Sequence, residues 1–431
     1  MSAGTEPTAS KPDDAQGQSA RRWGIPAVFA VGGGNVAGLI LGLASGAIAS
    51  RVLGPTLRGE LVVVQTWAGM AGVVMTLGVT QAVVTYTGSD NDLPRPLLLQ
   101  SGVALAFGCG LFVVLALSGT QAWMNSVGIF GGAALTAGML ISSNSAGLAQ
   151  RHGRMTGDFQ RVRLIPQVIG VLAIIWLWRA GIRETNTWLL ALGFAALLPS
   201  CIMMLSLLGG PQAVRMTHSW LPPRLLVRQA RSAFLLVIGS SVIYRIDGLF
   251  VAAWMPTEKV ALYAVAVAAA GACAAIGQAF GMLVFSQLRG ITEGKRQRAV
   301  ILRGTGRALV ATSAVAIPLI AIAPRAIQFV YGTAFVPAAG ATRLLVLASI
   351  PLAADYLLVH ALLIMGAGRR AFRVQLLAGL LTVSLLTAVV PTGRLELVAW
   401  VSVGAYSVSA MLLFTAAIRH TEPPQHSVIV T

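Results

Sequence analysis

Charged residues inside long apolar runs are the positions where this sequence can carry chemistry. Arg245 and Asp247 lie in the middle of one such run, between Ile243 and Gly248. A charge at the centre of a bilayer costs at least ~2.5 kcal/mol unless it is paired or hydrated. Two residues on a helix are separated by about 200°, so these side chains cannot pair on one face. We expect each to find a partner on another helix or to line a water-filled cavity, and we favour the cavity.

Asp355 and His360 form a second candidate pair in a later apolar run. A carboxyl group near an imidazole suits a proton relay, because both groups can take up and release a proton. Their spacing corresponds to about 140° around a helix, so they need not face one cavity. A structural role fits Asp355 as well as a relay does, and it fits His360 better. With Asp247, they are the candidate residues for gating or proton coupling.

Two arginines flank a short connection after the first apolar run. Arg51 and Arg58 belong to the segment 51–60, which ends in Glu60. Arginines at the mouth of a vestibule can bind an anionic headgroup through bidentate contacts with phosphate. The alternative is that they anchor the loop, with one of them paired to Glu60. We expect Arg51, Arg58 and Arg245 to be candidate substrate-binding residues.

The first apolar run also carries a ridge of small residues. Glycines recur at every fourth position of this run, at Gly34, Gly38, Gly42 and Gly46. Such a ridge favours close approach of another helix. Asn35 lies beside it and is a further candidate for a polar, substrate-binding pathway.

The elements that must position these residues are membrane-spanning helices. The chain is 56% apolar and only 10% charged, with a mean hydropathy of +0.77, whereas a soluble domain has about 25% charged residues. Runs long enough to cross a bilayer lie at roughly 26–50, 61–85, 96–118, 122–148, 164–180, 188–209, 232–254, 259–286, 304–323, 339–366, 371–391 and 396–418. The fold class is therefore an all-α polytopic membrane protein with about twelve transmembrane helices.

The distribution of basic residues predicts the orientation. With twelve spans, 22 of the 31 Lys and Arg residues fall on the side of the N-terminus, eight fall on the opposite side, and Arg245 lies within a span. This asymmetry matches the positive-inside rule with both termini in the cytoplasm. Six of the basic residues lie in 287–307 between apolar residues, which is typical of an amphipathic segment in contact with anionic membrane lipids.

The domain organisation follows from the longest connection. We expect a disordered cytoplasmic tail (1–22), an N-terminal six-helix bundle (23–209), a cytoplasmic linker (210–231), a C-terminal six-helix bundle (232–418) and a short cytoplasmic tail (419–431). Leu53-Gly54-Pro55-Thr56 and Trp254-Met255-Pro256-Thr257 match at an offset of 201 residues. The match indicates two halves of the same orientation, related by an axis along the membrane normal.

Several other functions are disfavoured. The net charge of +17 forms no continuous basic stripe with interleaved aromatic residues, so nucleic-acid binding is not expected. The three cysteines lie far apart in apolar runs and indicate neither a disulfide nor a metal site. Asp90-Asn91-Asp92 resembles a metal-binding signature of sugar-nucleotide transferases but sits in a short loop, where a solvated turn is the better interpretation. We expect no enzyme activity, cofactor or metal.

Three segments of the chain resemble the oligosaccharide flippases, the Wzx-type polysaccharide-biosynthesis branch of the MOP exporter superfamily. They are 51–85, with its Arg-x-Leu-Gly-Pro-x-x-Arg-Gly-Glu opening, the Tyr-Arg-Ile-Asp motif at 244–247, and the Val-Tyr-Gly-Thr-Ala-Phe-Val-Pro motif at 330–337. The resemblance covers roughly 24–418. It implies two six-helix bundles around a cavity that opens alternately to each side of a bacterial cytoplasmic (inner) membrane.

The resemblance also implies a cargo and partners. The cargo is a polyprenyl-diphosphate-linked oligosaccharide for cell-surface polysaccharide, with other polysaccharide-assembly proteins as further partners. Arg51, Arg58 and Arg245 would contact the diphosphate, and Asp247 and Asp355 would serve gating or proton coupling. Lipid II flippases of this superfamily often carry two extra spans, which are not found here. A cation-coupled multidrug exporter and a non-transporting membrane scaffold remain as alternatives.

Overall fold

The computed structural model describes residues 25–119, 123–153, 157–209, 221–288, 291 and 293–421. All regular elements in this part of the chain are helices, as the hydropathy predicts. The first are α2 (Ile25–Met75), α3 (Val79–Thr85), η1 (Asp90–Asp92), α4 (Pro94–Leu117), α5 (Ser126–Arg151), α6 (Asp158–Arg179) and α7 (Thr185–Leu207). They are followed by α9 (Arg224–Trp254), α10 (Thr257–Leu288), α11 (Gly294–Tyr331), η2 (Thr333–Ala338), α12 (Ala339–Ile364), α13 (Gly368–Val389), η3 (Val390–Thr392) and α14 (Leu395–Thr421).

The number of membrane crossings agrees with the sequence. Ten helices within the described residues are long and apolar enough to cross a bilayer. One of them, α2, consists of two arms, because its backbone leaves the helical conformation at Gly54. Helix α9 is not among the ten, but its 31 residues exceed the ~20 that a crossing needs. With α2 taken as two arms and α9 included, the expected twelve spans are present. The all-α polytopic fold is confirmed.

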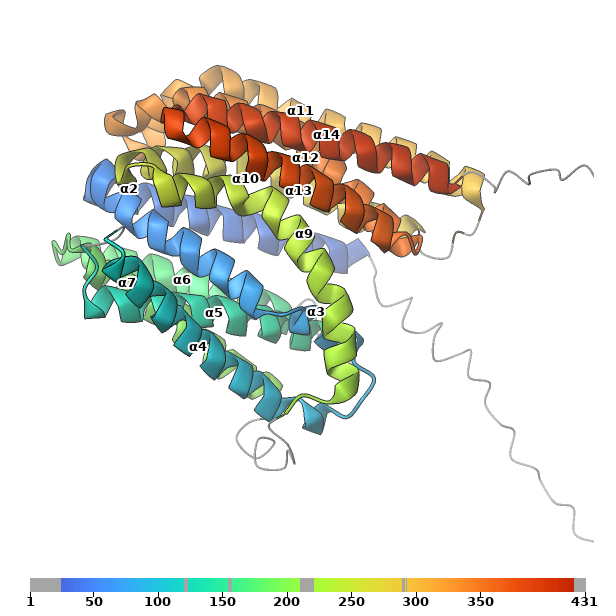
Figure 1. Cartoon of the computed structure of the whole chain (residues 1–431), viewed down its shortest axis with the longest axis horizontal. Helices are drawn as coiled ribbons and strands as arrows, with labels where there is room; N and C mark the ends of the chain where they lie inside the picture. The colour runs from blue at the N-terminus through green and yellow to red at the C-terminus, as the bar shows by residue number, and fades with distance from the viewer. Residues whose placement is uncertain are drawn as a thin grey trace, which may run out of the picture.

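The helices form an early group, α2 to α7, and a late group, α9 to α14 (Figure 1). Helix α2 packs against α5 and α6 of its own group and against α10 of the late group. Helix α9 connects the two groups: it contacts α3, α2, α13 and α10. Two surfaces therefore join the groups, one made by α2 and α10 and the other by α9 with α2 and α3.

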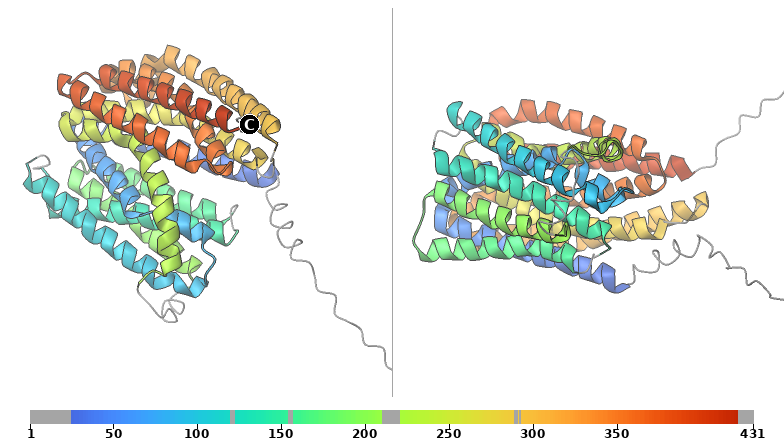
Figure 2. Two further views of the ribbon diagram at one scale, coloured as in Figure 1. Left: turned by 45° about the vertical axis from the view of Figure 1, so that its right-hand side comes forward. Right: turned by 90° about the horizontal axis from the view of Figure 1, so that it is seen from below.

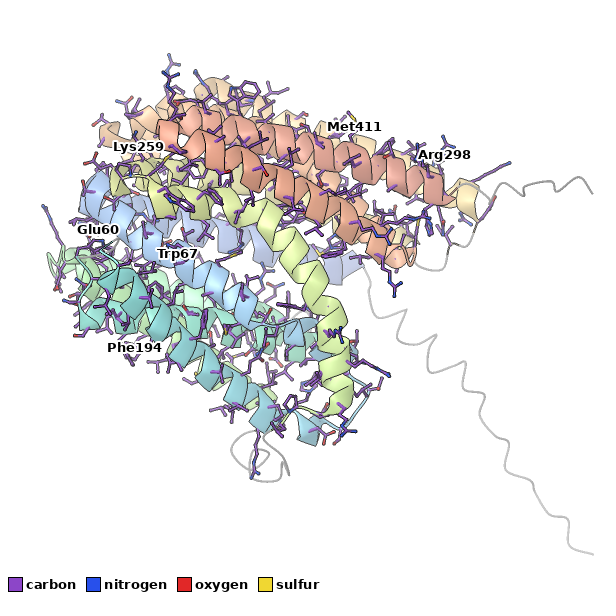
Figure 3. The ribbon with its side chains drawn as sticks, viewed as in Figure 1. Glu60, Trp67, Phe194, Lys259, Arg298 and Met411 are labelled. Carbon is purple, nitrogen blue, oxygen red and sulfur yellow. The ribbon has the colours of Figure 1, made fainter. Side chains whose placement is uncertain are left out.

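Most helices run roughly along one common direction, which α9 crosses at a steep angle, and this direction defines two ends of the molecule (Figures 1 and 2). We call one of them the terminal end, because α2 begins there and α14 ends there. Arg298 of α11 lies at the same end (Figures 1 and 3). At the other, the turn end, lie Glu60 and Lys259 (Figure 3). The beginning of α2 and the end of α14 lie together because the number of crossings is even.

The two Pro-Thr turns that match in sequence lie against each other at the turn end. Thr56 donates from Oγ1 to Oε1 of Glu258 at 3.1 Å. A Cβ on Gly59 would lie only 1.8 Å from the backbone oxygen of Thr257, so only glycine permits this approach. The internal match therefore marks the place where the early and late groups touch.

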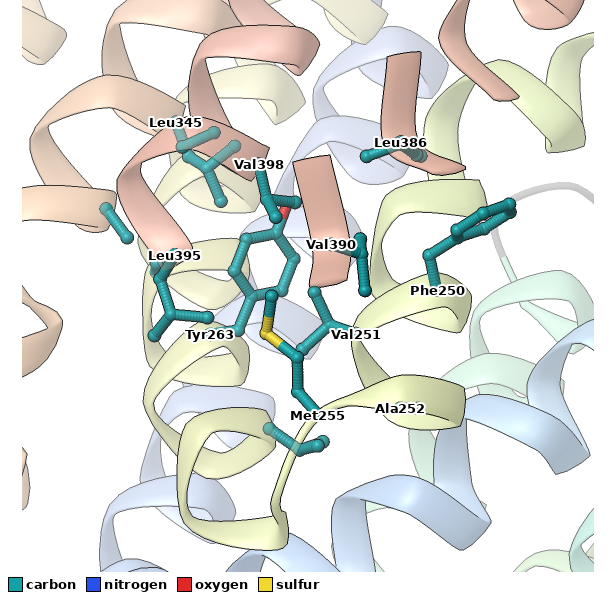
Figure 4. Close-up of a cluster of buried hydrophobic side chains, with 14 of the residues drawn as sticks. Phe250, Val251, Ala252, Met255, Tyr263, Leu345, Leu386, Val390, Leu395 and Val398 are labelled. Atoms are coloured by element: carbon teal, nitrogen blue, oxygen red, sulfur yellow. The ribbon is translucent and has the colours of Figure 1, made fainter. Parts of the chain in front are cut away.

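A buried hydrophobic cluster fixes the late group on α2. It contains Val62 and Val63 of α2 together with side chains of α9, α10, α12, α13, η3 and α14. Tyr263 of α10 lies within it, packed near Val251, Met255 and Val398 (Figure 4). The cluster buries the ring of Tyr263, and the hydroxyl group donates a hydrogen bond to Asp247, since a buried tyrosine hydroxyl usually has a polar partner.

Parts of the predicted domain plan fall outside the described residues, namely the tail 1–22, the linker 210–220 and residues 422–431. Residues 224–231 of the predicted linker are helical, as the first turns of α9, and 419–421 are the last residues of α14. Cys109, Cys201 and Cys273 are free thiols.

Replacement of Gly54 by alanine tests the kink in α2. Gly54 has φ 70° and ψ 178°, a region that is essentially restricted to glycine, so a Cβ there costs about 1–3 kcal/mol. We expect Gly54→Ala to lower the unfolding midpoint of the purified protein in detergent. The matched control is Gly102→Ala on α4, where a Cβ meets nothing within 4 Å. Equal midpoints for the two variants would contradict the assignment of strain to Gly54.

Candidate functional site

A cavity of about 790 Å³ lies between the two groups of helices. Its walls come from the second arm of α2 and from α3, α5, α9, α10 and α12. The charged residues on its wall are Arg58, Arg245 and Asp247. The structure thus brings together three of the candidates from the sequence.

Arg58 faces the cavity from the beginning of the second arm of α2. Its Nη1 donates to Oε1 of Gln65, another wall residue, at 3.3 Å. The neighbouring carboxylate of Glu60 instead accepts a hydrogen bond from Oγ1 of Thr185 at 2.6 Å. Among the described residues no carboxylate forms an ion pair with Arg58. Its hydrogen-bond partner is the neutral amide of Gln65.

Arg245 enters the cavity from the middle of α9. Arg245 is exposed, and it lines the cavity. Among the described residues it forms neither a hydrogen bond nor an ion pair. Gly69 of α2 leaves room for it, since a Cβ at that position would lie 3.4 Å from Nη1. An exposed arginine at mid-membrane with no carboxylate paired to it among the described residues can bind an anionic ligand.

Asp247 lies in the same helix but is buried, with 6% of its surface exposed. Oδ2 accepts from the hydroxyl groups of Tyr263 at 2.6 Å and Ser402 at 2.9 Å. Oδ1 accepts from the backbone N–H of Gly248 at 2.7 Å. Three donors from α9, α10 and α14 therefore satisfy this carboxyl group, and only neutral partners surround it.

Asp355 occupies an equivalent environment deeper in the late group and is fully buried. It accepts hydrogen bonds from the hydroxyl groups of Tyr244 and Ser409, each at 2.5 Å, and from Nε2 of Gln375 at 2.8 Å. Like Asp247, it has hydroxyl and amide partners and no cation among the described residues. It does not line the cavity.

Helices α9 and α14 hold both carboxyl groups. Ser402 and Ser409 are two turns apart on one face of α14, and each bonds one carboxylate. Tyr244, which bonds Asp355, precedes Asp247 by about one turn of α9. The Tyr244 ring also packs on Tyr356, with 4.6 Å between ring centroids. Tyr244 and Tyr356 both line the cavity, so a path of hydroxyl groups and rings leads from the cavity to Asp355.

The remaining candidates lie elsewhere. Arg51 donates from Nε to the backbone oxygen of Val330 at 3.0 Å and from Nη2 to that of Phe329, where α11 finishes and its last carbonyls lack helical partners. His360 bonds through Nδ1 to the backbone oxygen of Tyr356, one turn earlier in its own helix, at 2.7 Å. The backbone of Asn35 is part of α2, but its side chain lies outside the described residues.

The glycine ridge predicted in the first arm of α2 receives side chains of α6. A Cβ on Gly34 would lie 1.7 Å from Oε1 of Gln160, and a Cβ on Gly38 would lie 3.1 Å from Oε1 of Gln167. The glycines therefore permit close packing of α2 on α6, which agrees with the structural interpretation of the ridge.

Comparison with solved structures shows which known proteins share this arrangement of helices. No protein-family model matches the chain, and no curated protein matches it. A multidrug resistance MATE transporter of the MOP superfamily in an inward-facing conformation superimposes with a TM-score of 0.68 at 14% identity, over 89% of this chain and 94% of that one. The lipid II flippase MurJ in an inward closed conformation gives 0.69 at 11% identity, over 92% and 89%. An outward-facing MATE transporter gives 0.57 at 16% identity, over 93% and 97%.

The chain has the fold of the MOP-superfamily transporters. At such low identities the likeness establishes the fold and does not select a branch of the superfamily. In this chain the cavity lies between the two groups of helices, and Arg58, Arg245 and Asp247 line it.

A polar bridge across a break in the second span was missed by sequence reasoning. Leu77 and Gly78 have φ of 47° and 75°, and they separate α2 from α3. Nε2 of Gln100 donates to the freed backbone oxygens of Met75 at 2.8 Å and Thr76 at 2.9 Å. Uncharged side chains in apolar runs give little warning of such a role, although the glycine at position 78 was a signal.

Asn144 of α5 completes the bridge. Its Nδ2 donates to Oε1 of Gln100 at 3.1 Å, and its Oδ1 accepts from Oγ1 of Thr80 at 2.8 Å. The chain of hydrogen bonds therefore runs from one side of the break, through α4 and α5, to the other side in α3. Thr76, Gly78 and Thr80 line the cavity, so the break forms part of the site.

The acidic loop 90–92 has a structural role. Asp90 pairs with Nε of Arg151 at 2.7 Å, and Asp92 accepts from the hydroxyl group of Tyr86 at 3.0 Å. The same guanidinium donates to the backbone oxygen of Gly88 at 2.9 Å. Within the described residues no group of three or more potential metal ligands occurs.

Substitution of Gln100 by leucine tests the bridge. The variant removes the side-chain donor from both backbone oxygens. That of Thr76 keeps the N–H of Val79 at 2.7 Å, whereas that of Met75 loses its donor, which costs about 1–3 kcal/mol. We expect a clearly lower unfolding midpoint in detergent. The control is Ser384→Ala, which removes an exposed hydroxyl group that bonds only within its own helix, to Leu380. If Gln100→Leu unfolded at the same midpoint as this control, the bridge would not stabilise the break.

Proposed function

We propose that this protein is a transporter that moves a polyprenyl-diphosphate-linked oligosaccharide across the cytoplasmic membrane by alternating access, for cell-surface polysaccharide. The observation that carries the proposal is the pair Arg58 and Arg245 in one cavity, with no carboxylate paired to either among the described residues. Guanidinium groups bind phosphate in a bidentate manner, and the low-dielectric surroundings strengthen such a contact.

The single acidic residue on the described cavity wall, Asp247, forms no ion pair with either arginine. Asp247 is buried, and both of its oxygens already accept hydrogen bonds, from Tyr263, Ser402 and Gly248. The group available for a ligand is the guanidinium of Arg245. A diphosphate is the part of the proposed cargo that fits it.

The transport cycle follows from the two groups of helices. We propose that 23–209 and 232–418 act as two six-helix bundles that rock around the cavity. The contacts at the turn end, from Arg51 to the last carbonyls of α11 and from Thr56 to Glu258, join the groups and must break when the cavity opens there. The terminal end would face the cytoplasm, as the distribution of basic residues predicts.

Asp247 and Asp355 are the groups we assign to energy coupling. Both are buried carboxyl groups on neutral partners in the late group, and a change in protonation or bound cation would alter the hydrogen bonds that join α9 to α14. Since α9 also carries Arg245, such a change acts on the element that contacts the cargo. His360 lies one turn beyond Tyr356 on the same helix and is a secondary candidate.

A cation-coupled multidrug exporter is the second candidate function. It is favoured by the likeness to a MATE multidrug transporter over 89% of the chain and by the tyrosines Tyr244, Tyr263 and Tyr356 on the cavity wall, which can contact organic cations. The unpaired arginines oppose it. A non-transporting scaffold that recruits other polysaccharide-assembly proteins is the third alternative, and it requires no cavity chemistry at all.

The Arg245→Ala variant tests the proposed cargo. In proteoliposomes with a fluorescent polyprenyl-diphosphate sugar, we expect the flipping rate to fall at least tenfold, because loss of a charge-assisted contact costs about 1.5–3 kcal/mol. The control is Arg373→Ala, an exposed arginine of α13 outside the cavity, which should flip at the native rate.

The other outcomes separate the alternatives. Native protein that transports organic cations and flips none of several lipid-linked sugars would favour the multidrug exporter. Native protein that transports neither class would favour the scaffold. Equal flipping by Arg245→Ala and Arg373→Ala would remove Arg245 from the cargo site.

Neutral replacements of the buried carboxyl groups test energy coupling. Asp247→Asn and Asp355→Asn keep the size of the side chain and remove the group that can exchange a proton or hold a cation. We expect headgroup binding to persist while flipping no longer responds to an imposed proton or sodium gradient. Gradient-dependent flipping at the native level in both variants would exclude these residues from coupling.

A further inference from the structure

A second cavity lies at the turn end and shares no lining residue with the main one. Its volume is about 390 Å³, which lies within the range of small-ligand sites. It is formed by the end of the first arm of α2 and by the connection from α6 to α7. The residues that line it are Ile48, Arg51, Val52, Trp178, Gly181 and Arg183.

The backbone at the end of α6 brings Trp178 and Arg183 to the same cavity. Gly181, with φ 70°, ends the helix in a Schellman motif: its N–H bonds to the oxygen of Trp178 at 3.0 Å, and that of Ile182 bonds to the oxygen of Leu177 at 3.1 Å. The motif satisfies the last carbonyls of α6 and reverses the chain. Trp178 before it and Arg183 after it therefore face the same cavity.

Arg51 forms the opposite, fixed wall. Two of its N–H groups are held by the backbone oxygens of Phe329 and Val330, which leaves three of its five donors. These contacts hold the guanidinium in one orientation, so little entropy is lost when a ligand binds.

Arg183 is exposed, and within the described residues it has neither an ion pair nor a hydrogen bond. The nearest carboxylates in sequence are engaged elsewhere: Glu184 accepts from Thr187 at 2.8 Å and Glu60 accepts from Thr185 at 2.6 Å. The cavity therefore carries two positive charges and no competing anion from these neighbours.

Trp178 and the aliphatic wall indicate what kind of anion fits. Trp178 is 54% exposed and lies at the end of a membrane-spanning helix, where tryptophan marks the level of the lipid headgroups. Ile48 and Val52 make the rest of the wall apolar. A ligand with a phosphate group and an attached hydrocarbon chain satisfies both parts of the cavity.

We infer that this cavity binds the phosphate of a lipid headgroup between Arg51 and Arg183. The phosphate can come from a bilayer phospholipid or from a polyprenyl diphosphate at the leaflet surface. Because Arg51 also holds the end of α11, a lipid bound here would contact the place where the early and late groups are joined. The inference does not rest on the proposed cargo, since its test measures binding without transport.

The test measures lipid binding to the purified full-length protein by native mass spectrometry. The probes are dioleoyl phosphatidylglycerol, farnesyl diphosphate, inorganic pyrophosphate and, as a lipid without phosphate, dioleoylglycerol. We expect Arg183→Gln to weaken binding of the phosphate lipids about tenfold. Arg179→Gln is the matched control, because Arg179 is exposed, lies four residues away and does not line the cavity.

Each outcome decides a point. A loss confined to phosphatidylglycerol identifies the bilayer as the source, and a larger loss for farnesyl diphosphate identifies an isoprenoid diphosphate. A comparable loss for pyrophosphate assigns the site to free phosphate and overturns the lipid assignment. Equal binding by Arg183→Gln and Arg179→Gln, or binding of dioleoylglycerol as tight as that of the phosphate lipids, overturns the inference.

Discussion

A polar group that moves from water into a bilayer must be hydrogen-bonded, ion-paired or exposed to a water-filled space. This constraint determines how the helices of the protein are arranged. Asp247 and Asp355 are paired with neutral donors. Those of Asp247 come from its own helix α9 and from α10 and α14, and those of Asp355 come from α9, α13 and α14. Arg245 is exposed to the cavity, because it lines the wall from α9. The donors to the two carboxyl groups therefore link helices of the late group, and the charged residue without such a partner among the described residues faces the space where a ligand can enter.

The same constraint governs the backbone. The second span breaks at Leu77 and Gly78, where a helix would have closed its own hydrogen bonds, and lipid would not satisfy the freed oxygens. Gln100 donates to the oxygens of Met75 and Thr76, the second of which also accepts from the N–H of Val79. Asn144 bonds both Gln100 and, beyond the break, Thr80. A break that is bridged from two neighbouring helices can persist in the membrane, and it places Thr76 and Gly78 on the cavity wall.

Hydropathy was sufficient to predict the spans, because the cost of an exposed backbone in lipid leaves few alternatives to helices. The cost of an in-span charge was likewise sufficient to single out Arg245, Asp247 and Asp355. Their partners were not predictable, since hydroxyl and amide side chains such as Tyr263 and Gln375 carry no comparable cost, and the pairings join residues that are 16 to 155 positions apart. Arg51 shows the same limit: its charge was visible in the sequence, but its carbonyl partners on α11 depend on how the two groups meet.

The internal match also shows that equivalent positions of the two groups differ in chemistry. At the offset of 201, Arg58 corresponds to Lys259, but Arg58 faces the cavity while Lys259 donates to the backbone oxygen of Gly393 at 2.8 Å. The early group thus supplies a free cation at this position and the late group a structural one. The buried carboxyl groups occur in the late group, and α9 carries one of them within two residues of Arg245. Since both side chains belong to one helix, a rotation or shift of α9 that alters the hydrogen bonds of Asp247 must also move the guanidinium in the cavity.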